Sequence, residues 1–127
     1  MTIERLRDIR VLLVSHDVRF LRVTAFLLRR RGFAVVTAVG RGPALRNLEK
    51  GETDVVVVDG DGSVSAAARL AGALHAFHAH VAVVLCADPL PAPPLAAHIV
   101  SRFAPPDLLA AAIERSYARR DVLEAGA

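Results

Sequence analysis

Five short apolar runs alternate along the chain with stretches in which apolar residues recur at helical spacing. The most uniform run is the four valines of residues 55–58, which stand between Asp54 and Asp59. An unbroken run of β-branched residues is typical of a strand that is buried on both faces, as in the middle of a parallel sheet. The predicted strands are residues 11–14, 33–39, 55–58, 81–86 and 98–103.

Glycine, proline and serine between these runs indicate where helices begin and end. Gly32 ends the first predicted helix, Pro43 suits the first turn of the second, and Ser63 can cap the third. Two prolines, at 105 and 106, open the last helix. The alternation predicts an α/β protein with a flavodoxin-like, doubly wound parallel sheet of five strands in the order 2-1-3-4-5.

The segment Asp88–Pro94 interrupts this alternation, because it has four prolines in seven residues. Proline cannot occupy the interior of a helix, so the segment must be extended or turn-like. At most one helical turn, near residues 95–97, can follow before the last strand. We therefore expect the fourth helix of the fold to be shortened or missing.

Length and composition predict one intracellular domain. The chain has 127 residues, of which 54% are hydrophobic, and this is enough for one well-filled core. We expect a single domain over residues 1–127, with a polar leader at 1–8 and a short tail at 121–127. Cys86 is the only cysteine, so an intrachain disulfide is excluded, and no apolar run approaches the roughly 20 residues of a membrane span. These features favour a cytoplasmic protein without membrane contact.

The positive charge of the chain does not by itself indicate nucleic-acid binding. The formal net charge is only +3, and the basic residues are scattered except at 29–31 and 119–120. Both clusters fall where helices are predicted to end, and cations are favoured near the negative end of a helix dipole. No helix-turn-helix spacing, zinc-finger pattern or aromatic-basic interleaving is present. A nucleic-acid partner is not expected.

Candidate chemistry centres on Asp59, at the carboxyl end of the valine strand. In an open α/β sheet, ligands bind beyond the carboxyl ends of the strands, which favours a functional carboxylate. The alternative is that Asp59 only opens a turn, because it begins the sequence Asp-Gly-Asp-Gly. In the strand order 2-1-3-4-5, the first and third strands are neighbours. Asp59 is therefore expected to face Ser15, His16 and Asp17.

The order and spacing of these features resemble the receiver domain of two-component response regulators over nearly the whole chain. Asp54-(Val)4-Asp59 matches the phosphoacceptor strand of that family, Leu85-Cys86-Ala87 its Leu-Thr/Ser-Ala, and Arg102 its lysine. Gly32-Phe33-Ala34-Val35 matches a further Gly-aromatic-x-Val motif. The resemblance implies that Asp59 is the nucleophile that takes a phosphoryl group from a histidine kinase, with Mg²⁺ neutralising the phosphate oxygens. It also implies that Cys86 and Arg102 contact the phosphoryl group.

The sequence departs from the family at most partners of the aspartate. The acid pair of the Mg²⁺ pocket is replaced by Ser15 and His16, and an imidazole is a poor ligand for a hard ion. The candidate metal ligands are then Asp59, His16, Asp17 and Asp61, of which the last two match no direct ligand position. We expect Mg²⁺ binding to be weak or absent.

The two remaining contacts of the phosphoryl group are also changed. Arg102 has a planar fork that cannot occupy the slot of a compact ammonium, so we expect it to form a direct ion pair with Asp59 and partly replace the metal. We expect Asp59, His16 and Arg102 to form a fixed polar group. The S–H group of Cys86 is a weak donor, and a small hydrophobic role at the end of a buried strand is favoured for it. Ile99 stands where the family has its aromatic switch residue.

These departures predict a degenerate receiver, or pseudo-receiver. We expect a signalling module, not an enzyme, whose Asp phosphorylation is weak or lost and which acts by binding a protein partner or by forming a homodimer. One alternative is a working phosphoacceptor, phosphorylated at Asp59 by a histidine kinase. Another is a flavodoxin-like domain that binds a small ligand or catalyses a reaction, although no glycine-rich phosphate loop follows the first strand.

Overall fold

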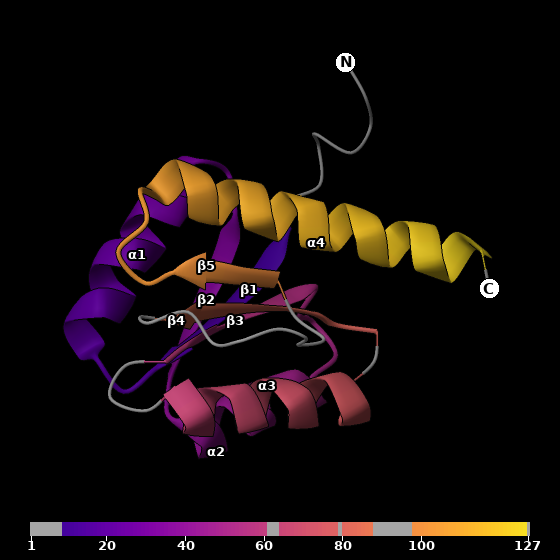
Figure 1. Ribbon diagram of the computed structural model, residues 1–127, viewed down its shortest axis with the longest axis horizontal. Coiled ribbons are helices and arrows are strands. Elements are labelled where there is room, and N and C mark those ends of the chain that lie inside the picture. Colours follow the sequence, from indigo (N-terminus) through magenta and orange to yellow (C-terminus); the bar gives the residue numbers. More distant parts are fainter. Residues whose placement is uncertain (1–8, 61–63, 79, 88–97, 127) are drawn as a thin grey trace.

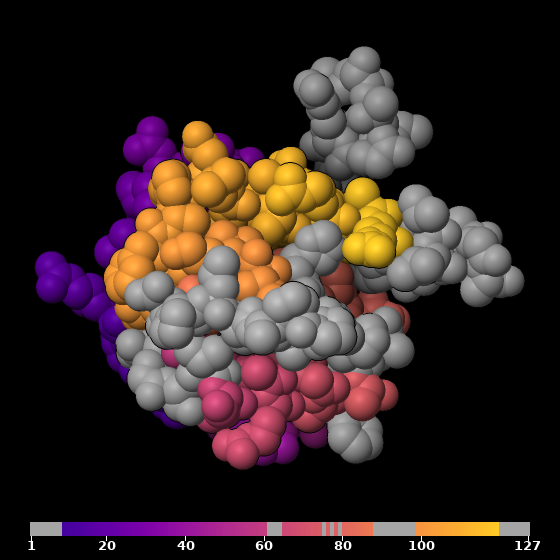
Figure 2. Space-filling model, viewed as in Figure 1, coloured from indigo at the N-terminus to yellow at the C-terminus, as the bar shows by residue number. Residues whose placement is uncertain are grey.

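The computed structural model describes residues 9–60, 64–78, 80–87 and 98–126, and these form a three-layer α/β domain. Helices α1 and α4 cover one face of the sheet, and α2 and α3 cover the other (Figure 1). In the space-filling view, α4 lies along the upper surface of the molecule and α3 along the lower one (Figure 2). The elements are β1 Arg10–Ser15, α1 Val18–Arg30, β2 Ala34–Val39, α2 Arg41–Glu49, β3 Val55–Asp59, α3 Val64–Phe77, β4 Ala82–Ala87, β5 His98–Ser101 and α4 Pro106–Gly126.

The sheet confirms the predicted fold class. Its five strands are all parallel and lie in the order β2-β1-β3-β4-β5. The register pairs Val14 with Val58 and Asp59 with Cys86, so the ends of β1, β3 and β4 lie side by side. The carboxyl ends of β1, β3 and β4 therefore lie together at one edge of the sheet.

Side-chain alternation along the strands divides the core into two layers. Val55 and Val57 pack in the layer under α1 and α4, whereas Val56 and Val58 pack in the layer under α2 and α3. Successive side chains of a strand point to opposite faces, and both faces here are covered by helices. This explains why β3 is an unbroken run of valines, each of them at most 2% exposed.

Helix α4 differs from the sequence-based expectation at its carboxyl end. It continues to Gly126, so the expected short tail at 121–127 is helical over all its described residues. Arg119 consequently lies inside α4, and the last turn of this helix contains no basic residue. The prediction that this arginine cluster marks a helix end is wrong, because the sequence after it has no glycine or proline until Gly126. The cluster at the end of α1 is where it was expected.

The helix that we predicted to be shortened or missing belongs in the connection from β4 to β5. Residues 88–97 lie outside the described residues, as does the expected polar leader at 1–8. The described part of the chain contains four helices, and the helix after β5 is the fourth of them. None of these described helices combines the length and the apolar composition that a membrane span requires.

Candidate functional site

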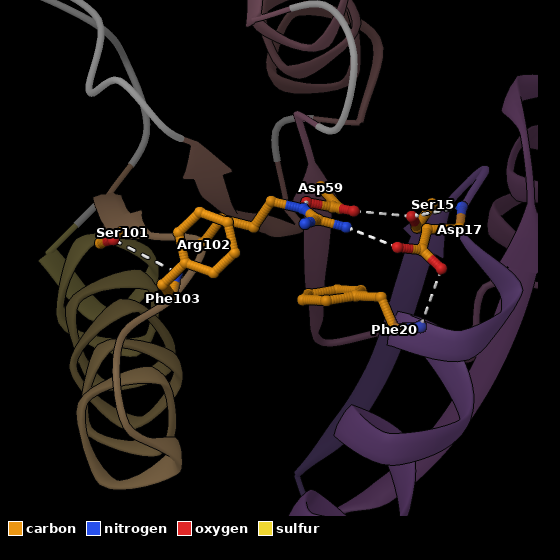
Figure 3. Close-up of polar contacts among 7 residues, drawn as sticks. All are labelled: Ser15, Asp17, Phe20, Asp59, Ser101, Arg102 and Phe103. Carbon is orange, nitrogen blue, oxygen red and sulfur yellow. Dashed lines mark hydrogen bonds and ion pairs between the residues drawn. The ribbon is translucent and has the colours of Figure 1, made fainter.

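Four side chains meet at the carboxyl edge of the sheet, and we call Ser15, Asp17, Asp59 and Arg102 the polar cluster (Figure 3). Ser15 ends β1, Asp59 ends β3, and Arg102 follows β5. Asp17 is the N-cap residue of α1. β1 and β3 are neighbouring strands, and β5 lies one strand further along, beyond β4. The fold thus joins residues separated by as many as 85 positions through hydrogen bonds.

Asp59 is enclosed within this cluster, and its side chain is 0% exposed. The Ser15 hydroxyl donates to its Oδ2 atom at 2.7 Å, and Nε of Arg102 donates to its Oδ1 atom at 2.8 Å. A buried carboxylate is tolerated only when it is paired and hydrogen-bonded, and both conditions are met here. The ion pair predicted between Asp59 and Arg102 is thus confirmed.

Arg102 bridges two carboxylates with different nitrogen atoms. While Nε contacts Asp59, Nη2 donates to Oδ2 of Asp17 at 2.8 Å. The guanidinium carbon lies 4.9 Å from the centre of the Phe20 ring and 5.7 Å from that of Phe103, within cation–π range. A planar fork can make this combination of contacts, whereas the compact ammonium of a lysine cannot.

Asp17 supports the cluster from the start of α1. Its Oδ1 atom accepts from the backbone N–H of Phe20 at 3.1 Å, and its own backbone N–H donates to Oγ of Ser15 at 2.9 Å. The bond from Phe20 and then the bond from Arg102 lower the pKa of Asp17. The carboxylate therefore stays ionised, and its stabilising contribution is present above its ordinary pKa of 3.8 and is lost as the pH falls further.

Cys86 lies on the same face of the sheet as Asp59 but forms part of the hydrophobic core. It is 2% exposed and packs in the layer under α1 and α4. Burial, and then the charge of Asp59, raise the pKa of the thiol to about 12. The thiol is consequently protonated at neutral pH and is not a nucleophile there.

The raised pKa of the Cys86 thiol predicts a loss of stability at alkaline pH. Between its ordinary pKa of 9.0 and about 12, Cys86 is ionised in the unfolded chain but protonated in the folded one. The unfolded state then binds fewer protons, so the free energy of unfolding falls by roughly 1.4 kcal/mol per pH unit in this window. Urea titrations of the wild type and Cys86→Ala from pH 7 to 11 measure this slope. The difference in the free energy of unfolding between the two proteins should be constant below about pH 9 and shrink above it. If the free energies of both proteins changed in parallel with pH, the raised pKa of Cys86 would be refuted.

His16 does not join the polar cluster, and the prediction that it forms a fixed group with Asp59 and Arg102 is wrong. Leu13 packs in the α1/α4 layer and Val14 in the other, so Ser15 continues on the side of Asp59 and His16 falls on the side of α2. The His16 ring lies instead against Gly40, where an added Cβ would be 3.0 Å from its Cε1 atom.

Of the candidate metal ligands, Asp17 and Asp59 meet at Arg102, whereas His16 lies apart from them. Asp61 lies outside the described residues, and among those described no group of three or more His, Cys, Asp or Glu side chains is placed to hold a metal ion. Mg²⁺ prefers several oxygen ligands, but both oxygens of Asp59 are engaged and a guanidinium already lies beside them. The described residues do not fit Mg²⁺.

Comparison with solved structures identifies the fold. A CheY-like response regulator receiver domain protein from Methanospirillum hungatei superposes with a TM-score of 0.74 at 17% identity, covering 90% of this chain and 97% of that one. A response regulator receiver domain protein from Clostridium thermocellum gives a TM-score of 0.76 at 18% identity, covering 91% and 98%. The chain has the receiver fold. No protein-family model and no curated protein matches its sequence.

The same receiver fold occurs in a larger protein. The signal receiver domain of an HD domain-containing protein from Pseudomonas fluorescens gives a TM-score of 0.76 at 17% identity, with 93% of each chain covered. Asp59 ends β3, and the sequence resemblance predicts the phosphoacceptor at this residue.

The contacts that Ser15, Phe20 and Phe103 make with the charged side chains of the polar cluster were not predicted from the sequence. Ser15 was expected to face Asp59, but the hydrogen bond that its hydroxyl donates to this carboxylate was not predicted. Phe20 and Phe103 flank the Arg102 guanidinium, and their signal was weak, because single aromatic residues near strand ends have no diagnostic spacing.

Proposed function

We propose that the protein is a receiver-type module of two-component signalling in which Asp phosphorylation is weak or lost and which acts by binding a protein partner. The observation that carries this proposal is the enclosure of Asp59, whose two oxygens are engaged by Ser15 and Arg102 in a fully buried position. The proposed module is not an enzyme, in keeping with the signalling receiver domains that share its fold.

Phosphorylation would require Asp59 to release an oxygen as the nucleophile. Freeing Oδ1 breaks the bond from Arg102, and a hydrogen bond between charged groups contributes about 1.5–3 kcal/mol. This alone lowers the population of the competent state by roughly tenfold to 150-fold. In addition, no Mg²⁺ would be available to neutralise the phosphoryl oxygens, because the described residues do not fit it. Both effects act against transfer.

The surface beside Arg102 supports partner binding as the mode of action. A hollow of about 380 Å³ lies between α1 and the start of α4, and its lining includes Arg102, Val23 and Phe103. The last two are exposed apolar side chains, at 53% and 72%. Since Phe103 also packs against the Arg102 guanidinium, a protein that covers this ring would contact the polar cluster indirectly. A histidine kinase is the partner that the receiver resemblance suggests.

The proposal predicts at most a minor phosphoryl adduct at Asp59. The protein is incubated with Mg²⁺ and a small phosphodonor such as acetyl phosphate, and its intact mass is recorded beside that of Asp59→Asn. The mass of Asp59→Asn should remain unchanged, and the unmodified mass should remain the main species of the wild type. A wild-type adduct that becomes the main species and that Asp59→Asn abolishes would contradict the proposal and establish a working phosphoacceptor.

A positive control shows that the assay can detect transfer in this fold. The triple variant Ser15→Asp, His16→Asp, Arg102→Lys restores the acid pair and the lysine that the resemblance implies. Its added carboxylates provide oxygen ligands for Mg²⁺, so it should acquire an adduct that depends on both Mg²⁺ and Asp59. Far-ultraviolet circular dichroism checks that the variant is folded.

A further inference from the structure

A second cavity opens at the same edge of the sheet, on the side of α2 and α3. Its volume is about 490 Å³, within the range of small-molecule sites. Its described lining consists of Val14, Ser15, His16, Gly40, Arg41, Val58, Asp59, Ala66, Ala67, Arg69 and Leu70. We propose that this cavity binds a small organic phosphate of nucleotide size.

The charges of the lining favour an anion. Arg41 from the start of α2 and Arg69 from α3 are both exposed and border the cavity from two sides, and His16 adds a donor from the end of β1. Arginine presents several donors in a fork that matches phosphate geometry. The described lining contains one acid, Asp59, whose side chain is 0% exposed and already paired with Arg102. The accessible charge of the described lining is therefore positive.

The start of α2 adds backbone donors to the same wall. Its N-cap residue is Gly40, with φ 86° and ψ 177°, and no side chain caps the helix. The first amides of a helix have no intrahelical acceptor, so those of Arg41 and Gly42 are available to an anion, while Pro43 has none to offer. Gly40 also lets the His16 ring approach this backbone closely. A phosphate group placed here would meet side-chain and backbone donors together.

The rest of the cavity suits an organic body rather than a free ion. The rest of the lining is apolar: Val14, Val58 and Ala67 are each at most 6% exposed, and Leu70 of α3 is half-buried and offers exposed apolar area. Inorganic phosphate would leave this part of a cavity of about 490 Å³ unfilled. A flat ring attached to the phosphate would cover it, and burial of that apolar area would add to the affinity.

This inference does not rest on the proposed function, since it depends on Arg41 and Arg69 rather than on whether Asp59 accepts a phosphoryl group. Failure of one leaves the other standing. The replacement of the family acid pair by Ser15 and His16 disfavours Mg²⁺ and at the same time removes the negative charge that would repel a phosphate from this cavity.

Isothermal titration calorimetry with adenosine monophosphate tests the inference, with adenosine and inorganic phosphate as comparison ligands. The variants are Arg41→Gln and Arg69→Gln, and Arg22→Gln on the exposed surface of α1 removes the same charge from outside the cavity. Each cavity variant should weaken nucleotide binding by about tenfold, whereas Arg22→Gln should change it by less than about twofold. Adenosine and inorganic phosphate should both bind more weakly than the nucleotide.

Three results would overturn the inference. One is the absence of nucleotide binding at millimolar concentration. Another is equal weakening by Arg22→Gln and the cavity variants, which would indicate only general attraction to a basic surface. The third is inorganic phosphate binding as tightly as the nucleotide, because the apolar wall would then make no contribution. All three arginines are exposed, so thermal unfolding should show the variants to be as stable as the wild type to within about 0.5 kcal/mol.

Discussion

Replacing Arg102 by methionine should lower the free energy of unfolding by about 3–5 kcal/mol, the usual cost of leaving a buried charge without its partner. Methionine retains most of the apolar stem, so its contacts with the Phe20 and Phe103 rings are largely kept. What is removed is the guanidinium that contacts Oδ1 of Asp59 and Oδ2 of Asp17 at 2.8 Å each. Asp59 cannot turn to water instead, because its side chain is 0% exposed.

Urea unfolding followed by circular dichroism measures this loss. Arg22→Met, at an exposed site on α1, is the matched control and should change the stability by no more than about 0.5 kcal/mol. Arg102→Lys should fall between the two, because an ammonium can reach one carboxylate but cannot bridge both. If Arg102→Met were as stable as Arg22→Met, the ion pair would not be what makes the burial of Asp59 tolerable.

The second large effect is expected at the opposite edge of the sheet, where Asp54→Ala should cost about 2–4 kcal/mol. Asp54 is 1% exposed, and its Oδ2 accepts from the backbone N–H of Arg10 at 2.9 Å and from Nε at 3.1 Å. Its Oδ1 accepts from Nη2 of the same arginine at 3.0 Å. These bonds join the start of β3 to the start of β1, so alanine removes three bonds and leaves a cavity.

The same urea experiment tests Asp54→Ala, with Glu49→Ala at the exposed end of α2 as its control. Glu49→Ala should be nearly neutral. Because Asp54 lies away from the polar cluster, its replacement should leave the mass-spectrometric result at Asp59 unchanged. A loss below about 1 kcal/mol would mean that the bonds to Arg10 are exchanged for water at little cost.

The fold could be predicted from the sequence because its signals are local and mutually consistent. The valine strand before Asp59 indicated a central parallel strand, and the alternation of strands and helices then left few topologies. The extent of α4 could not be predicted in this way. No residue between Arg119 and Gly126 breaks a helix, and the arginine cluster resembled a helix end only by its charge.

The site was predicted in position but only partly in its contacts. The receiver resemblance placed Arg102 beside Asp59, and their opposite charges implied the ion pair that is present. Successive side chains of β1 point to opposite faces of the sheet, so only one of Ser15 and His16 can lie on the face of Asp59. The sequence does not reveal which one, because β1 is apolar on both faces. Arg41 and Arg69 belong to no motif, so their shared cavity became evident only once α2 and α3 were placed on the same face.

A double-mutant cycle on Asp59 and Arg102 tests most directly the claim that the protein neutralises this carboxylate with its own arginine. Free energies of unfolding are measured for the wild type, Asp59→Asn, Arg102→Met and the double variant. Removing both charges leaves no buried ion unpaired, so the double variant should be more stable than Arg102→Met alone, with a coupling of about 2–3 kcal/mol. Additive losses, with a coupling below about 0.5 kcal/mol, would contradict the claim.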